Sequence, residues 1–141
     1  MAITQLSLFL MNQPGQLVDA VGAIADCGAN LRAMSIAEAN DFGILRAIVS
    51  DSDKVFTSLK DRFLISRTQV VAARMDDRSG ALFPILKLLN EANINIEYMY
   101  AFTGTGPDEA YVVLRVNDAD TAEAILHAGG IETLSDESLK L

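Results

Sequence analysis

The sequence contains no tryptophan, one cysteine and one histidine among its 141 residues. A single cysteine can form no disulfide within the chain, so the fold must be stabilised by packing alone. Cys27 and His127 have no second His or Cys at the spacing of a metal site, and no nucleophile stands in a pattern with a base. We therefore expect no metal, no cofactor and no catalytic residues.

Basic residues are also few, since 11 Lys and Arg stand against 19 Asp and Glu, a formal charge of -8. Binding to nucleic-acid phosphates or anionic lipids depends on Lys and Arg, which argues against nucleic acid and membrane partners. The longest early apolar run, Leu8 to Met11, is far shorter than the roughly 20 residues that cross a bilayer. Because no signal-peptide pattern is present either, we expect a cytoplasmic protein.

What the sequence does contain is an internal repeat. Residues 12–17 read NQPGQL and residues 77–82 read DRSGAL, and setting Gly15 against Gly80 also sets Asn30 against Asn95 without a gap. Further along, the second copy is longer by two residues, which fall in the loop-like segment TGTGPD at 103–108. Units of this size are marginally stable alone, so we expect the two copies to dock.

Each copy predicts the same order of elements from its apolar periodicity and its turn residues. The expected strands are 6–11, 30–38, 42–50 and 63–65 in the first copy, and 69–75, 95–102, 110–116 and a weak one near Ile131 in the second. In the first copy, one expected helix begins at Leu17 and ends before Gly28, and a second begins after a cap at Asp51. The expected helices of the second copy cover 81–92 and 119–127. The order is βαββαβ, twice. The predicted fold class is therefore α+β, with two ferredoxin-like units and antiparallel sheets, and the predicted domains are 1–67 and 68–141.

The first strand has apolar side chains on both faces. Leu6, Leu8 and Leu10 share one face, while Phe9 and Met11 share the other. In a ferredoxin-like unit the helices cover one sheet face, so the second face needs another cover. The other repeat or a second chain could supply it, and a homodimer is expected on this ground.

These residues also carry a resemblance to a known family. The first loop and helix, with the segment GANL at 28–31, resemble the ACT domain, a small-molecule sensing module attached to many amino-acid biosynthetic enzymes. The second loop, with ANINI at 92–96, is similar, and the whole chain resembles stand-alone tandem ACT proteins over residues 3–134. The loop residues concerned are Asn12, Gln13, Pro14, Gly15, Gln16 and Leu17, and Asp77, Arg78, Ser79, Gly80, Ala81 and Leu82.

The resemblance implies that a free amino acid or similar small metabolite binds at an interface between ACT units. The strand-to-helix loop would contact the polar head of the ligand, with help from the Asn that begins the second strand, Asn30 or Asn95. Ser79 stands where the family usually has Pro, which implies a less rigid second loop. The resemblance also implies a partner enzyme or process of amino-acid metabolism.

The chemistry of the loop agrees with this role. Gly lets a ligand approach the backbone closely, and the free N–H groups at a helix start attract a carboxylate. Asn12 and Asn30, like Asp77 and Asn95, offer oxygens to an α-ammonium group. The alternative is that these residues only form turns, as they do in many proteins. Their recurrence at the same spacing in both copies favours a site.

The second strands of the two copies differ in size. Three small residues in the first copy correspond to three aromatic ones in the second: Ala33, Ser35 and Ala37 against Tyr98, Tyr100 and Phe102. We hypothesise that the aromatic face lines the ligand pocket, with Tyr98 and Tyr100 contacting the ligand. The alternative is that the rings only fill space in a core.

Three classes of function remain. The leading one is a non-catalytic regulatory protein that binds an amino acid and thereby changes a partner's activity. A small enzyme is the second. The third is an RNA-binding module with the same βαββαβ order, but such modules stack bases on aromatic residues of strands one and three. The third strand of the first copy has no ring, and that of the second has only Tyr111.

Overall fold

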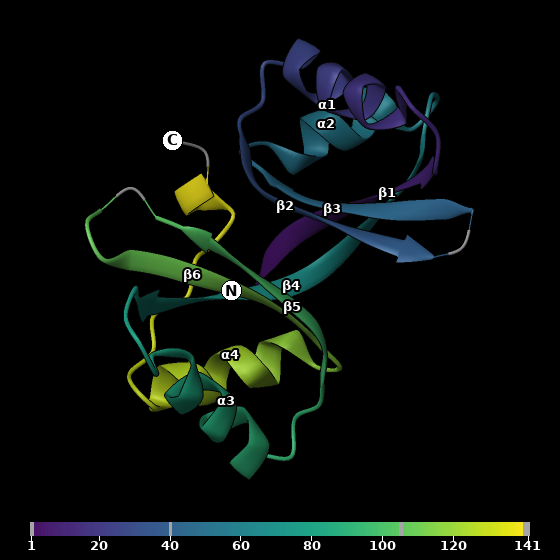
Figure 1. Ribbon diagram of the computed structural model, residues 1–141. Coiled ribbons are helices and arrows are strands. Elements are labelled where there is room, and N and C mark those ends of the chain that lie inside the picture. Colours follow the sequence, from purple (N-terminus) through teal and green to yellow (C-terminus); the bar gives the residue numbers. More distant parts are fainter. Residues whose placement is uncertain (1, 40, 105, 140–141) are drawn as a thin grey trace. The chain divides into compact units, whose positions relative to one another are not determined.

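The computed structural model describes residues 2–39, 41–104 and 106–139 and has six strands and four α-helices among them (Figure 1). The chain divides into an amino-terminal unit, Thr4–Thr68 with Leu139, and a carboxy-terminal unit, Gln69–Ser138 with residues 2 and 3. The predicted α+β class with two ferredoxin-like units and antiparallel sheets is confirmed. The elements are β1 (Ile3–Met11), α1 (Gln16–Asp26), β2 (Leu31–Ala39), β3 (Phe42–Val49), α2 (Ser52–Leu59), β4 (Leu64–Asp76), α3 (Leu82–Glu91), β5 (Ile96–Thr103), β6 (Glu109–Val116), α4 (Ala119–Ala128) and the 3-10 helix η1 (Glu137–Leu139).

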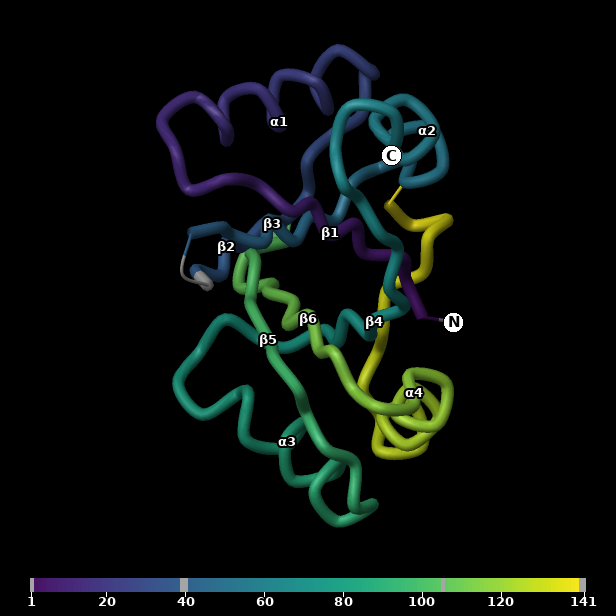
Figure 2. Tube along the Cα trace, turned by 90° about the vertical axis from the view of Figure 1, so that its right-hand side faces the viewer, coloured from purple at the N-terminus to yellow at the C-terminus, as the bar shows by residue number. Residues whose placement is uncertain are grey.

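In the amino-terminal unit the strand order is β2-β3-β1, with antiparallel pairing throughout. Helices α1 and α2 lie on one side of these strands (Figure 2). As predicted, Leu6, Leu8 and Leu10 share the face that packs on the helices, where they meet Ile24 of α1 and Val55 of α2. This face holds the core of the unit.

In the carboxy-terminal unit the order is β4-β6-β5, again antiparallel. Helices α3 and α4 lie on one side of the strands (Figure 2). Val71 of β4 and Leu114 of β6 pack there against Ile85, Leu89 and Leu126 of the two helices. The second core therefore repeats the design of the first.

The helix ends follow the expected chemistry. Asp51 caps α2 by accepting a hydrogen bond from the Lys54 N–H at 3.2 Å, and Asp118 caps α4 in the same way through Thr121. Helices α1 and α3 have no side-chain cap. Pro84 lies in the first turn of α3, where its missing N–H costs little. The two helices that follow the repeated loops thus begin without a side-chain acceptor.

The Asp118 cap gives a testable pH dependence. Hydrogen bonds from the Thr121 hydroxyl and backbone N–H hold the pKa of Asp118 below its usual value. A carboxylate whose pKa is lowered by folding stabilises above its ordinary pKa, and this is lost as pH falls through the lowered value. Asp118→Ala should therefore lower the urea midpoint at neutral pH, and the difference from the parent should vanish in strong acid. A difference that persists in acid would rule out the ionised cap, and Asp120→Ala is the control.

Gly22 lies inside α1, and an added Cβ there would meet nothing within 4 Å. Because glycine in a helix interior costs about 0.5–1 kcal/mol relative to alanine, Gly22→Ala should stabilise the chain by that amount. Gly28 ends the same helix at a φ of +74°, where alanine is strained, so Gly28→Ala should destabilise. Urea unfolding of both variants measures the two opposite signs, and equal signs would contradict the assignment.

Two expected strands differ in the structure. The strands at 63–65 and 69–75 form one continuous strand, β4, because Ser66, Arg67 and Thr68 contain no turn-forming Gly, Pro, Asn or Asp. The weak strand near Ile131 is reduced to a single bridge between Ala73 and Thr133. It follows the pair Gly129 and Gly130, and glycine favours turns over strands.

The sheet faces turned away from the helices also carry buried residues, namely Ile48, Val70, Ala72 and Val113. Tyr98, Tyr100 and Phe102 of β5 share that face of their own sheet and are half-buried. Phe9 and Met11 remain exposed at 39% and 53%. These sheets therefore have apolar packing on more than the helical side.

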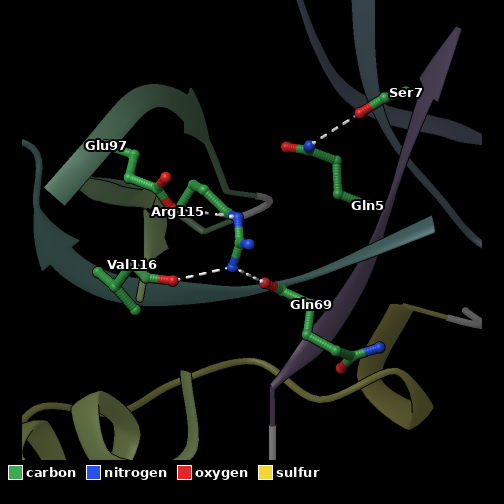
Figure 3. A network of polar contacts seen from close by, with 6 residues as sticks. All are labelled: Gln5, Ser7, Gln69, Glu97, Arg115 and Val116. Carbon is green, nitrogen blue, oxygen red and sulfur yellow. Dashed lines mark hydrogen bonds and ion pairs between the residues drawn. The ribbon is translucent and has the colours of Figure 1, made fainter. Parts of the chain in front are cut away.

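Arg115 joins three strands of the carboxy-terminal unit (Figure 3). Its Nη1 donates to the carbonyl oxygens of Val116, at 2.8 Å, and Gln69, at 3.5 Å, while Nε lies 3.5 Å from Glu97 Oε2. The guanidinium thus ties the edge strand β5 to β6 and β4.

None of the helices that the structure describes combines the length and the apolar character needed to span a bilayer.

Candidate functional site

The first repeated loop connects β1 to α1 through residues 12–15. The Asn12 N–H donates to the carbonyl of Asp41 at 3.0 Å, which fixes the loop against the turn between β2 and β3. Gly15 has a φ of +90°, a left-handed conformation that favours glycine, and it turns the chain into α1. Of the first three N–H groups of α1, that of Gln16 donates to Gln13 at 3.4 Å, and no side chain caps the others.

This loop borders a cavity of about 360 Å³, which we call the loop cavity. Its volume is at the small end of the roughly 300–1,000 Å³ of ligand sites, as suits a small metabolite. Four predicted site residues come together here: Asn12, Gln13, Gln16 and Leu17. Pro14 and Gly15 form the loop beside it but do not line it. The other lining residues are Leu10, Met11, Ile36, Glu38, Phe42 and Gly43.

Sequence reasoning missed Ile36, Glu38, Phe42 and Gly43 as site residues. They are brought to the loop by strand register, because Glu38 pairs with Gly43, which in turn pairs with Leu10. One signal was available in the sequence: Gly43 is the one glycine within the six strands. Glycine inside a strand often marks a place where another group approaches closely.

Asn30 lies at the other end of α1 from the loop. Its backbone N–H donates to the Ser50 hydroxyl at 2.8 Å, and its carbonyl accepts from the Ser50 N–H at 2.9 Å. A helix of 11 residues is about 16 Å long, so Asn30 and the loop of the same unit do not meet. The structure shows Asn30 joining β2 to the end of β3 and does not place it beside the loop cavity.

The second loop, between β4 and α3, repeats this geometry. The Asp77 N–H donates to the Asp108 carbonyl at 2.8 Å, and Gly80 has a φ of +81°. The Arg78 Nε lies 3.4 Å from Asp76 Oδ2, an exposed ion pair. Prediction of matching backbone turns in the two copies therefore agrees with the structure.

A cavity of about 250 Å³ also borders this second loop. It lies beside β4 and the segment that follows α4, and its lining is more highly charged than that of the loop cavity. Of the predicted residues it includes Arg78 and Ala81, whereas Asp77, Ser79, Gly80 and Leu82 lie outside its lining. Sequence reasoning missed three of its charged residues, Arg74, Asp76 and Glu132. Arg74 and Asp76 belong to β4, before the loop, and Glu132 comes from the segment after α4. The remaining lining residues are Met75, Pro84, Ile85, Gly130 and Ile131.

The other predicted residues of the second copy lie elsewhere. Asn95 is exposed at the far end of α3, a helix of 10 residues. Tyr98 and Tyr100 lie on the helix-free face of β5, opposite Arg115 and Val113 of β6. They do not line the cavity at the second loop. A contact between these rings and a ligand remains a prediction.

Tyr111 of β6 has an acidity that its surroundings alter. Its hydroxyl donates to Glu109 Oε1, and its ring stacks on Phe102 with centroids 5.3 Å apart. Burial first, and then the hydrogen bond and negative charge of Glu109, raise the pKa of Tyr111 to about 12. A Cβ at Gly104 or Gly106 of the TGTGPD loop would lie within 3 Å of the Glu109 side chain, which would have to shift.

The raised pKa of Tyr111 predicts a late step in an alkaline titration. A group whose pKa is raised by folding stabilises below its ordinary pKa, near 10 for tyrosine, and loses this as pH rises through about 12. Absorbance of tyrosinate should show a step near the higher value. Tyr111→Phe should remove that step, and Glu109→Gln should move it to lower pH. A late step that survives in Tyr111→Phe would contradict the assignment.

A family model described as an ACT domain pair matches residues 1–141. The solved structure of protein BT0572 from Bacteroides thetaiotaomicron is 38% identical, with 99% of this chain and 96% of that chain covered and a TM-score of 0.91. No curated protein matches the sequence.

Two more distant structures share the fold. The regulatory subunit of aspartate kinase from Thermus thermophilus, in its ligand-free form, is 16% identical over 92% of each chain, with a TM-score of 0.67. The corresponding subunit from Thermus flavus is 14% identical over 91% of this chain and 90% of that chain, with a TM-score of 0.62.

Proposed function

Because this chain belongs to the family of ACT domain pairs, we propose that it is a non-catalytic regulatory protein that binds a free amino acid or similar small metabolite. The bound ligand would change the activity of a partner enzyme or process of amino-acid metabolism. The observation that carries this proposal is the loop cavity, where the first repeated loop meets a hollow of suitable size. Residues 1–67 and 68–141 would act as its two ACT domains.

The polar groups around the loop cavity suit the head of an α-amino acid. The uncapped start of α1 offers backbone N–H groups and the positive end of the helix dipole to a carboxylate. Asn12, Gln13 and Gln16 offer amides that both donate and accept. Glu38 adds a negative charge, which suits an ammonium group.

The position of Asn30 supports a second ACT unit at each ligand. An amino acid that contacts the loop is too small to reach along α1 to Asn30 of the same unit. If Asn30 or Asn95 takes part in binding, as the predicted site has it, it must do so from another ACT unit. We propose a homodimer as one source of that unit. Measurement of the mass of the protein assembly in solution, with and without ligand, tests it.

A thermal-shift screen with the twenty amino acids tests the proposed function. A ligand at a hundred times its dissociation constant adds about 2.7 kcal/mol to stability, which is a visible shift for a small domain. Asn12→Ala should reduce the shift without changing the stability of the free protein, and Asn117→Ala, exposed and distant in sequence, is the control. If no amino acid acts while a nucleotide or RNA does, the proposal fails.

A further inference from the structure

We propose that the loop cavity of the amino-terminal unit takes an α-amino acid with an uncharged, apolar side chain, and that the missing side chain of Gly43 makes room for it. This inference rests on the proposed function and names the class of its ligand. Three features of the described residues support it: the floor of the cavity, its apolar walls, and the placement of charge around it.

Gly43 forms part of the floor. It lies in β3 between Glu38 of β2 and Leu10 of β1, on the sheet face that the helices cover. No register shift accompanies it, so it does not serve a β-bulge. An added Cβ would meet Ala37 O at 3.5 Å and Ile36 Cγ2 at 3.6 Å, which are ordinary contacts. Neither the backbone nor crowding within the chain therefore requires glycine here.

The walls are apolar and incompletely covered. Leu17, Ile36 and Phe42 line the cavity, and Ile36 is 53% exposed although it faces the same side as the core. Burying such surface against an apolar side chain would be favourable. A polar or charged side chain would instead lose its hydration without gaining a partner from these walls.

The lining of the cavity offers one charged group, which suits the ammonium group of a ligand, and none to pair with a charged side chain. Its one ionisable lining residue is Glu38, and no ion pair joins this carboxylate to another described residue. The α-carboxylate is left to the uncapped N–H groups at the start of α1. Asp19, the acidic residue of that first turn, is not among the lining residues of the loop cavity and lines the adjoining hollow, which shares Gln16 with it.

The carboxy-terminal unit lacks these features at matching positions. Ala110 occupies the place of Gly43 and is buried, and Thr103, its partner on β5, occupies the place of Glu38. Pro84 also removes one N–H from the first turn of α3. The cavity at the second loop contains two arginines and two carboxylates instead. The apolar site is thus a property of the first unit alone within the described chain.

The test uses the full chain and Gly43→Val, which places two methyl groups in the cavity. Valine is a better strand residue than glycine, so the free variant should be at least as stable as the parent. Calorimetric titration should show that leucine, isoleucine, valine, methionine or phenylalanine binds the parent, and that Gly43→Val weakens this at least about tenfold. Glu38→Gln should weaken it by about ten- to a hundredfold. Gly22→Ala and Asp26→Asn, both on α1 away from the cavity, should bind as the parent does.

The outcomes separate this inference from the proposed function. Binding of an apolar amino acid that is lost in Gly43→Val supports both. If only a charged amino acid binds, or if Gly43→Val binds as tightly as the parent, the inference is overturned and the proposed function stands. If Gly43→Val changes the number of chains in the assembly in solution but leaves the affinity for the amino acid unchanged, the cavity is a contact between copies and the inference is overturned. If no amino acid binds the parent, both fail.

Discussion

Leu8→Ala is expected to lower the free energy of unfolding by about 2–5 kcal/mol. Leu8 is fully buried in β1 and packs in the core beneath α1 and α2. Its truncation removes apolar contacts and leaves a cavity that neighbouring residues cannot close easily, because β1 is held to β3 by a hydrogen-bonded ladder. Urea or thermal unfolding measures the loss.

Phe9→Ala, one residue further along the same strand, is the matched control. Phe9 is 39% exposed on the opposite face, and its recorded ring contact is with Phe42, at 6.3 Å between centroids. Loss of such an aromatic pair costs about 0.5–1.5 kcal/mol beyond the buried area. Although more atoms are removed, the cost should be smaller than that of Leu8→Ala. Equal costs would show that the alternation of faces in β1 is wrongly assigned.

Val113→Asp is expected to destabilise the protein by at least about 3 kcal/mol. Val113 lies on the face of β6 turned away from the helices, yet it is as fully buried as Val112 on the helical face. A carboxylate there loses its hydration without a partner. Burial raises the pKa of such a group, so the variant should regain stability relative to the parent as pH falls.

Val18→Asp provides the control for the same change of residue. Val18 is 74% exposed in the first turn of α1, where a negative charge suits the helix dipole. Its effect should be within about 0.5 kcal/mol of zero. Denaturation of both variants, followed from neutral to acid pH, gives the comparison. If Val113→Asp proved as mild as Val18→Asp, the helix-free face of β6 would have to be open to water.

The fold could be predicted from the sequence because its signals are local and occur twice. Asp51 capped its helix as expected, and Gly28 ended α1. Besides the weak strand near Ile131, which is reduced to a single bridge, the exception is β4, where two short strands are expected. A turn is favoured most by Gly, Pro, Asn or Asp, and residues 66–68 include none of these, so the strand continues.

The candidate site was predictable only in part. Asn12, Gln13, Gln16 and Leu17 are neighbours in sequence, so one loop motif located them together. Glu38 and Gly43 reach the same cavity through pairing of β2, β3 and β1, which depends on the register of three strands. Asn30 is named by the family resemblance rather than by the loop motif, and α1 separates it from the loop of its own unit by the full length of the helix.

The continuity of β4 has a practical consequence for limited proteolysis of the protein. Proteases need a locally unfolded stretch of chain, and they find it at loop tips rather than inside strands. Arg67, a trypsin target by its chemistry, lies within β4 at the boundary between the two units. Brief digestion should therefore spare this junction, and separate halves must be made by gene truncation, with each half ending in a severed strand.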